Sequence, residues 1–545
     1  MDTIGIVLAM LVAVVVSGAV TRFLPFAVPT PLVQIALGGV IALFSGRPVR
    51  LQPDIFFLLF LPPLLFLDGW RIPKEDLLRD KVTILELALG LVFFTVIGMG
   101  YFLHWMIPVM PLPIAFALAA IVSPTDPIAV SAITRRVPAP RRLLHVLEGE
   151  SLLNDASGLV CFRFAVAAAV TGSFSLPTAT LSFVHLVVGG IAIGVGLTAV
   201  VLFVVHAISS RIGEEAGSEV LISLLLPFAA YEAAEHSGGS GILSAVAAGI
   251  TMSYIELFGK ALAITRMQRS AVWNTLQFAL NGTVFVLLGE QLPAILSDAT
   301  RTVAQSEHTN PAWLAVYVLA MVGGLAALRF LWVWVTLRLS AFAQLARGAA
   351  VPRKVSARLI AALSVAGVRG AITMAGVLTL PLTLRDGAPF PTRDLAILLA
   401  AGTIVGSLLG ASIVLPRLLQ GIEVPAEPAA EREADEARVA AAEAAISAIE
   451  RLARESPADS DESELRSQAA TRLVDFYRHR IEGRDSNGES AAQIRRADEI
   501  ERSLRLAGLR AERDRIFELA RSQSLSDATA RKLVRNIDLL EERLR

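Results

Sequence analysis

The stretch "IVSPTDPIAV", residues 121–130, places an aspartate and two prolines inside a run that is otherwise apolar. Pro124 and Pro127 each lack a backbone N–H and clash with the preceding helical turn. A helix through this run is therefore predicted to open around Thr125 and Asp126. Two interpretations stay open at this point: a proline kink that the aspartate caps, or a polar site whose freed carbonyl groups face a cavity.

The sequence around this stretch indicates an all-α, polytopic membrane protein. Of its 545 residues, 54% are hydrophobic and only 18% are charged, with a mean hydropathy of +0.60. Because a helix needs about 20 apolar residues to cross a hydrocarbon core of ~30 Å, the chain offers thirteen candidate spans. They lie near 3–20, 31–45, 54–69, 82–104, 112–133, 147–171, 181–207, 217–236, 240–256, 271–296, 312–337, 357–380 and 395–419.

A second interrupted helix is predicted late in the chain. The segment "VAGVRGAITMAGVL", residues 365–378, is punctuated by glycines and carries Arg369 inside an apolar span. Two broken helices in corresponding halves are typical of transporters built from inverted repeats. An arginine at this depth needs a partner, and we expect a buried ion pair for Arg369 and for Arg329, the latter with Glu150.

The sixth predicted span holds the richest polar cluster. In "LEGESLLNDASGLVCFR", residues 147–163, Glu150 and Asn154 are four residues apart, as are Ser151 and Asp155. Residues at this spacing share one face of a helix. That face presents the carboxylate, hydroxyl and amide oxygens that a hard monovalent cation accepts.

Other polar residues are less informative. Asn281, in the tenth predicted span, is a candidate neighbour of the polar site. The single cysteine, Cys161, excludes an intrachain disulfide, and none of the seven histidines belongs to an HExxH motif. A metalloenzyme or a thiol enzyme is therefore disfavoured.

Lysine and arginine gather in alternate loops between the predicted spans, which is typical of cytoplasmic loops. The opposite loops hold only Arg47, Arg50, Arg301, Arg385 and Arg393. With thirteen spans, this asymmetry predicts an external N-terminus and a cytoplasmic C-terminus.

The composition changes after residue 420, so we predict a membrane domain over 1–420 and a cytoplasmic helical domain over 421–545. Alanine, glutamate and arginine dominate the second part, with turns expected near "SPADSDES" at 456–463 and "GRDSNGES" at 483–490. We interpret it as a regulatory or dimerising module whose partner is unknown.

Taken together, the motifs resemble those of the monovalent cation:proton antiporters of the NhaP and sodium/proton exchanger type. The resemblance rests on five stretches in order, at 123–127, 147–160, 240–250, 280–292 and 367–372: "SPTDP", "LEGESLLNDASGLV", "SGILSAVAAGI", "LNGTVFVLLGEQL" and "GVRGAI". It covers the whole membrane region, and "IDLLEERL" at 537–544 is similar to the tail of bacterial members. The resemblance implies a homodimer in which two broken helices cross beside an ion site within a mobile six-helix core.

The resemblance also implies roles for single residues. Asp155 is similar to the essential aspartate that binds Na⁺ or a proton, and Asn154 matches the Asn-Asp pair of the electroneutral branch. Thr125, Asp126 and Ser151 correspond to residues at the ion site. Glu150 and Arg329 resemble a stabilising ion pair, and Arg369 resembles the arginine at the second broken helix.

The expected function is secondary antiport of Na⁺, with Li⁺ or K⁺ as alternatives, for H⁺ across the cell (inner) membrane, in pH and sodium homeostasis. The expected partners are Na⁺, H⁺, the lipid bilayer and a second copy of the chain, with no cofactor, no nucleic acid and no enzymatic reaction. Two alternatives stay open: a K⁺/H⁺ antiporter on the same scaffold, and a membrane sensor that signals through its tail.

Overall fold

The computed structural model of the chain is helical in every described element except an isolated bridge between Thr383 and Pro389. The residues described are 3–23, 28–45, 53–71, 86–126, 130, 141–172, 176–258, 263–304, 312–346, 357–384, 387–420, 428–454, 460–485 and 489–544. The chain forms two compact units, Met1–Val424 and Pro425–Arg545. The boundary predicted from the sequence, after residue 420, lies four residues earlier.

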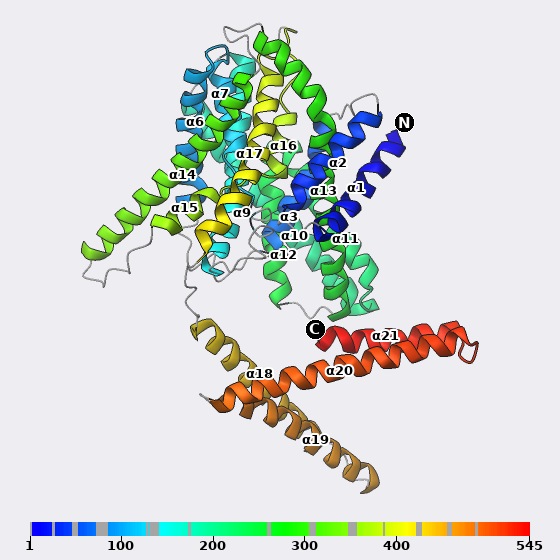
Figure 1. Ribbon diagram of the computed structural model, residues 1–545. Coiled ribbons are helices and arrows are strands. Elements are labelled where there is room, and N and C mark those ends of the chain that lie inside the picture. The colour runs from blue at the N-terminus through cyan, green and yellow to red at the C-terminus, as the bar shows by residue number, and fades with distance from the viewer. Residues whose placement is uncertain are drawn as a thin grey trace. The chain divides into compact units, whose positions relative to one another are not determined.

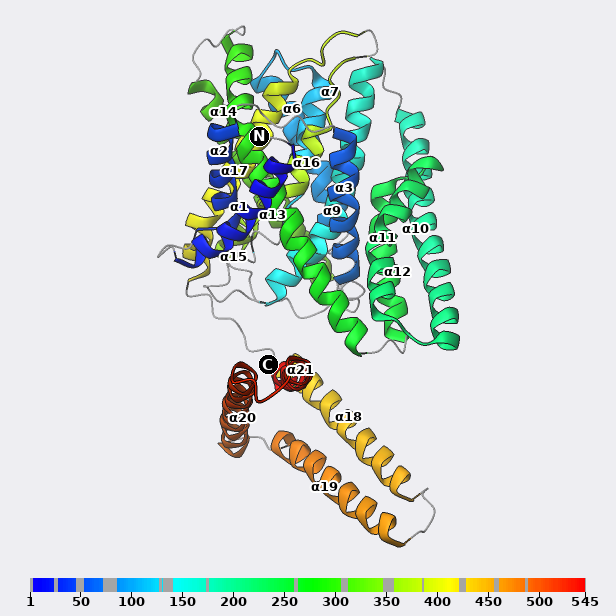
Figure 2. The same ribbon diagram turned by 90° about the vertical axis from the view of Figure 1, so that its right-hand side faces the viewer.

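The helices of the first unit pack as two bundles (Figures 1 and 2). Bundle A contains α1 (Thr3–Phe23), α2 (Thr30–Ser45), α3 (Pro53–Arg71), α10 (Leu176–Ile212), α11 (Ala216–His236), α12 (Gly241–Phe258) and α13 (Ala263–Ala304). Bundle B contains the π-helix η1 (Glu86–Leu91), α6 (Val92–Met106), α7 (Leu112–Val122), α9 (Arg141–Thr171), α14 (Ala312–Ala346), α15 (Ala357–Val365), α16 (Ala371–Leu378) and α17 (Arg393–Leu419). The bundles meet where α3 and α13 contact α9, α16 and α17.

Each of the thirteen predicted spans overlaps a helix of the structure, which confirms the all-helical fold class. Among the described residues, seven helices are long and apolar enough to cross a membrane, and four further apolar helices are shorter. The shorter ones include α7, because the helix predicted over 112–133 ends at Val122. The number of thirteen crossings itself stays a prediction.

Glycines let the helices of bundle A approach closely. A side chain at Gly38 of α2 would collide with the carbonyl oxygen of Val286 on α13, and one at Gly289 would collide with that of Ile35. Small residues of this kind bring helix backbones together inside a membrane, where packing and not water exclusion drives association. The stretch "LNGTVFVLLGEQL", residues 280–292, therefore contains a close contact between α13 and α2, at Gly289.

The second unit consists of four helices, α18 (Pro428–Arg454), α19 (Ser460–Asp485), α20 (Glu489–Arg521) and α21 (Asp527–Leu544). Helices α18 and α19 pack against each other, as do α20 and α21. Ser526 caps α21, since its hydroxyl accepts a hydrogen bond from the backbone N–H of Thr529 at 3.3 Å. The helices are separated near both predicted turns.

Candidate functional site

The first break in bundle B follows α7. The helix ends at Val122, and Ser123–Asp126 are not helical. Because Pro124 has no N–H to continue the helical ladder, the last carbonyl groups of α7 need other donors. The carbonyl oxygen of Val122 accepts a hydrogen bond from Nε of Arg369, at 2.8 Å.

The second break separates α15 from α16 and spans residues 366–370. Arg369 in this break is buried, and its guanidinium donates to the carbonyl oxygens of Val122 and Gly367. Among the described residues, the partners of the Arg369 guanidinium are these carbonyl oxygens and not a carboxylate, so the expected buried ion pair is not observed. The arginine instead places its positive charge where two interrupted segments expose carbonyl groups, which carry partial negative charge.

The two breaks are joined to each other. The backbone N–H of Asp126 donates to the carbonyl oxygen of Val368, at 2.7 Å. Gly370, the residue before α16, lies so close to the Asp126 side chain that a methyl group there would collide with the carboxyl group. Asp126 is thus held beside the N-terminus of α16, where the helix dipole favours a negative charge.

The polar face of α9 is buried, as the four-residue spacing predicted. Glu150 meets Arg329 of α14 through two hydrogen bonds, of 2.5 and 2.6 Å, and Arg329 also donates to the carbonyl oxygen of Leu363 at 2.9 Å. The side-chain amide of Asn154 donates to Thr125 at 3.1 Å and to Glu150 at 3.4 Å. These contacts tie α9 to α14, to α15 and to the first break.

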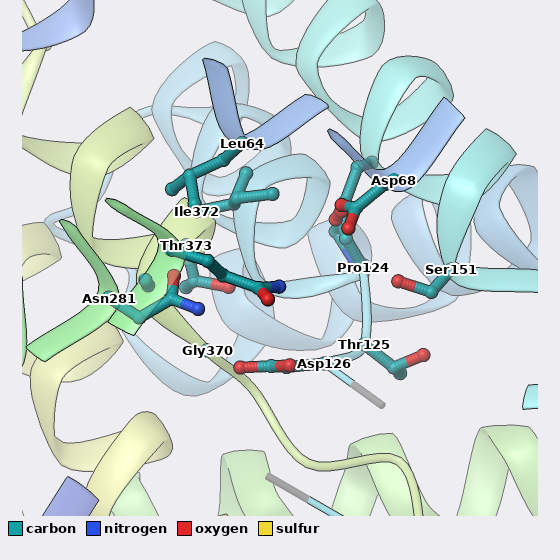
Figure 3. Close-up of a pocket in the computed structure, with 13 residues that line it drawn as sticks. Leu64, Asp68, Pro124, Thr125, Asp126, Ser151, Asn281, Gly370, Ile372 and Thr373 are labelled. Atoms are coloured by element: carbon teal, nitrogen blue, oxygen red, sulfur yellow. The ribbon is translucent and has the colours of Figure 1, made fainter. Parts of the chain in front are cut away.

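A cavity of about 40 Å³ lies where the bundles meet (Figure 3). This is room for a few water molecules, or for a cation that keeps part of its water shell. Its polar walls come from α3, the break after α7, α9, α13 and α16; the lining residues are Leu64, Asp68, Pro124, Thr125, Asp126, Ser151, Asp155, Gln277, Asn281, Gly370, Ala371, Ile372 and Thr373.

The cavity brings together most of the residues expected at the ion site. Ser151, Asp155, Thr125 and Asp126 line it, and so does Asn281. The remaining expected residues, Asn154, Glu150, Arg329 and Arg369, are buried behind the wall. Their contacts support the residues that line it.

Three polar lining residues were not predicted from the sequence: Asp68, Gln277 and Thr373. Asp68 comes from the last two turns of α3 and lines the cavity (Figure 3). Gln277 comes from α13, one turn before Asn281. The signal for Asp68 was an aspartate that ends the apolar run "LLFLPPLLFLD", which is equally typical of a residue at the membrane surface.

The lining residues carry three carboxyl groups, of Asp68, Asp126 and Asp155, and include no lysine, arginine or histidine. Within the described ranges, no three His, Cys, Asp or Glu side chains are arranged to hold a metal ion. Burying several carboxylates without neutralisation is costly. The cavity therefore favours the entry of cations or protons.

Residues 7–421 match the family model "Sodium/hydrogen exchanger, transmembrane". The "Uncharacterized Na(+)/H(+) exchanger YjcE" of Escherichia coli K12 is 39% identical over 99% of this chain and 98% of that protein. The sodium, potassium, lithium and rubidium/H(+) antiporter of Bacillus pumilus is 44% identical over 76% of this chain, but the match spans only 60% of that protein.

Among solved structures, the fold is similar to that of the sodium proton antiporter MjNhaP1 from Methanocaldococcus jannaschii at pH 8. The TM-score is 0.60 with 18% sequence identity, over 78% of this chain and 99% of that one. This likeness concerns the fold, whereas the family model covers the whole of bundles A and B except the first residues of α1. The chain belongs to the sodium/hydrogen exchanger family.

Proposed function

We propose that this exchanger moves Na⁺ and H⁺ in opposite directions across the cell membrane, with Asp155 as the group that binds either ion. The observation that carries the proposal is the cavity between the bundles, which Asp155 lines together with Asp68 and Asp126. Occupation by a proton and occupation by a cation exclude each other at one carboxylate, and this exclusion couples the two fluxes.

The proposed cation ligands are oxygens of the cavity wall. The carboxyl groups of Asp155 and Asp68 and the hydroxyl group of Ser151 are of the kind that hard cations prefer. Thr125 and Asp126 also line the cavity and contribute oxygen atoms from the unwound segment, as interrupted helices do at the ion sites of other transporters. Asn154, whose amide is bound to Thr125 and Glu150, acts by holding that segment.

Alternating access follows from the position of the cavity. Because its walls belong to two bundles, a movement of one bundle against the other exposes the site to one side of the membrane and then to the other. An empty, ionised Asp155 opposes this movement, since a charge in the apolar barrier costs at least roughly 2.5–3.5 kcal/mol. The bundles therefore move only when Asp155 holds a proton or a cation, so neither ion is transported without the return of the other.

The charge balance proposed here is one Na⁺ for one H⁺. Asp155 is preceded by Asn154, so the pair offers one titratable carboxyl group and not two.

We further propose an external N-terminus, a cytoplasmic tail and a homodimer, and a role in pH and sodium homeostasis. The basic residues of alternate loops support the orientation.

Potassium is a second candidate cation. The Bacillus pumilus relative carries sodium, potassium, lithium and rubidium in its name, and the cavity is lined by oxygens that do not select among these ions by type. Transport of Na⁺, Li⁺ and K⁺ compared in one preparation distinguishes a sodium exchanger from a broad one.

The proposal is tested with the purified full chain in lipid vesicles that hold an imposed pH gradient. Addition of Na⁺ outside should collapse the gradient in wild-type vesicles and should have no effect with Asp155→Asn, because the amide cannot carry a proton. Full Na⁺-dependent proton movement in Asp155→Asn would reject Asp155 as the shared site.

A further inference from the structure

Ser407 of α17 contacts the second break. Its side chain is buried, and its hydroxyl group donates to the carbonyl oxygen of Ile404 at 3.0 Å. The same oxygen accepts a hydrogen bond from the backbone N–H of Arg369 at 3.2 Å. The hydroxyl proton of Ser407 is thus donated within α17, and a lone pair of the same oxygen accepts the N–H of Arg369 in the second break.

The peptide group between Val368 and Arg369 is held on both sides. Its N–H donates to Ser407, and its carbonyl oxygen accepts from the N–H of Asp126. One peptide plane therefore links α17 to the unwound segment after α7. Its rotation would move Asp126, which lines the cavity, and Arg369, which binds Val122.

Other hydroxyl groups of α17 make no such link. Ser412 donates to the carbonyl oxygen of Leu409 at 2.8 Å, three residues before it, in the same way as Ser407 donates to Ile404. Thr403 bonds the carbonyl oxygen of Leu399 and lies 3.8 Å from the sulfur of Met321. The contact with the break is therefore specific to Ser407, and Ser412 is its matched control.

We propose that Ser407 is a positioning residue for the ion site, which fixes the Val368–Arg369 peptide and through it the place of Asp126 in the cavity. The role rests on the proposed exchange function, because it concerns the geometry of the same cavity. Without the hydroxyl group, the buried N–H of Arg369 loses its acceptor and the peptide plane is free to rotate towards another one.

The test measures the Na⁺ concentration that gives half-maximal proton movement in vesicles, for the wild-type chain and for Ser407→Ala, Ser407→Thr, Ser407→Val and Ser412→Ala. We expect this concentration to rise roughly tenfold in Ser407→Ala, the scale of one lost buried hydrogen bond, with a smaller change of the maximal rate. Ser412→Ala should behave as wild type.

Threonine and valine have nearly the same shape, so the pair at position 407 separates the hydroxyl group from packing. Ser407→Thr should stay within roughly threefold of wild type while Ser407→Val follows Ser407→Ala. Equal behaviour of the Thr and Val variants, or an unchanged half-maximal concentration in Ser407→Ala, would overturn the role of Ser407. A wild-type chain without Na⁺-driven proton movement would instead reject the proposed function itself.

Discussion

Glu150 and Asp155 are both buried on α9 but have different neighbours. The carboxylate of Glu150 is neutralised by Arg329 and accepts further hydrogen bonds from Thr125 and Asn154. Asp155 lines the cavity and pairs with no basic side chain in the described part of the chain. The first residue is therefore suited to a structural role, and the second to binding a transported ion.

The Glu150–Arg329 pair leads to a prediction about stability. Glu150→Gln and Arg329→Gln should each lower the thermal unfolding temperature of the purified protein, because a buried charge left without its partner costs about 3–5 kcal/mol. The double variant should recover part of the loss, since no unpaired charge remains. Losses that simply add in the double variant would show that the two groups act independently.

The half-exposed pair of Arg163 and Glu235 is the control. It is also an ion pair between two helices, at 2.8 Å, but its side chains are 35% and 32% exposed, against 4% and 1% in the Arg329–Glu150 pair. Arg163→Gln should therefore lower the unfolding temperature less than Arg329→Gln, because it leaves a less buried charge without its partner. The comparison separates the effect of burial from that of pairing.

At the residue scale, sequence reasoning succeeded where a charge stood inside an apolar span. Asp155, Glu150 and Arg329 are of this kind, and each is buried in the structure. Asp68 was missed because it ends its apolar run and is followed three residues later by Arg71, a pattern typical of a membrane surface. Its place in the same cavity as Asp155 depends on how bundle A packs on bundle B, which no local pattern encodes.

At the element scale, the two broken helices stabilise each other. The side chain of Arg369, in the second break, donates to the carbonyl oxygen of Val122 at the end of α7. In return, the carbonyl oxygen of Val368 accepts from the backbone N–H of Asp126 in the first break. Neither interrupted segment could face lipid alone, because its free backbone groups would have no partner. The prolines and glycines of the sequence predicted where the helices open, but not that the breaks would bind one another.

Gly370 tests this close approach. A methyl group at position 370 would collide with Cβ and Cγ of Asp126 as well as with its carboxylate oxygen, so a rotation of the carboxyl group alone would not relieve the clash. Gly370→Ala should therefore displace Asp126 and reduce Na⁺-driven proton movement at least tenfold. Gly410→Ala, on α17, is the control, because a methyl group there meets no atom within 4 Å. Wild-type transport by Gly370→Ala would show that the cavity tolerates a displaced Asp126.

Helix boundaries were less predictable than helix positions. The span expected over 271–296 belongs to α13, Ala263–Ala304, which extends beyond it at both ends. Apolar residues mark the part of a helix that contacts lipid or core, whereas polar turns such as the one with Arg269 continue the helix through contacts with Glu219 and Glu256. These tertiary contacts were not visible in the sequence.

At the scale of the whole molecule, the candidate site and the tail belong to different units. The cavity is lined only by residues of the first unit. The match to the sodium/hydrogen exchanger family covers residues 7–421. We therefore propose that exchange requires the first unit and not the four helices of the second.

A chain that ends at Val424 tests this division. It should keep Na⁺-driven proton movement within about twofold of the full chain, because no residue of the cavity is removed. A changed pH dependence with an intact maximal rate would assign the tail a regulatory role. Loss of transport in a truncated chain that still folds and inserts would contradict the assignment of exchange to the membrane unit alone.

We propose that one carboxyl group, that of Asp155, binds either a proton or a sodium ion. Proton release on addition of Na⁺ to the purified protein, in weakly buffered solution at a pH where the site is protonated, tests this exchange at the site itself. We expect release that approaches one proton per chain with saturation in Na⁺, and none from Asp155→Asn. Sodium binding without proton release, or equal release from Asp155→Asn, would contradict it.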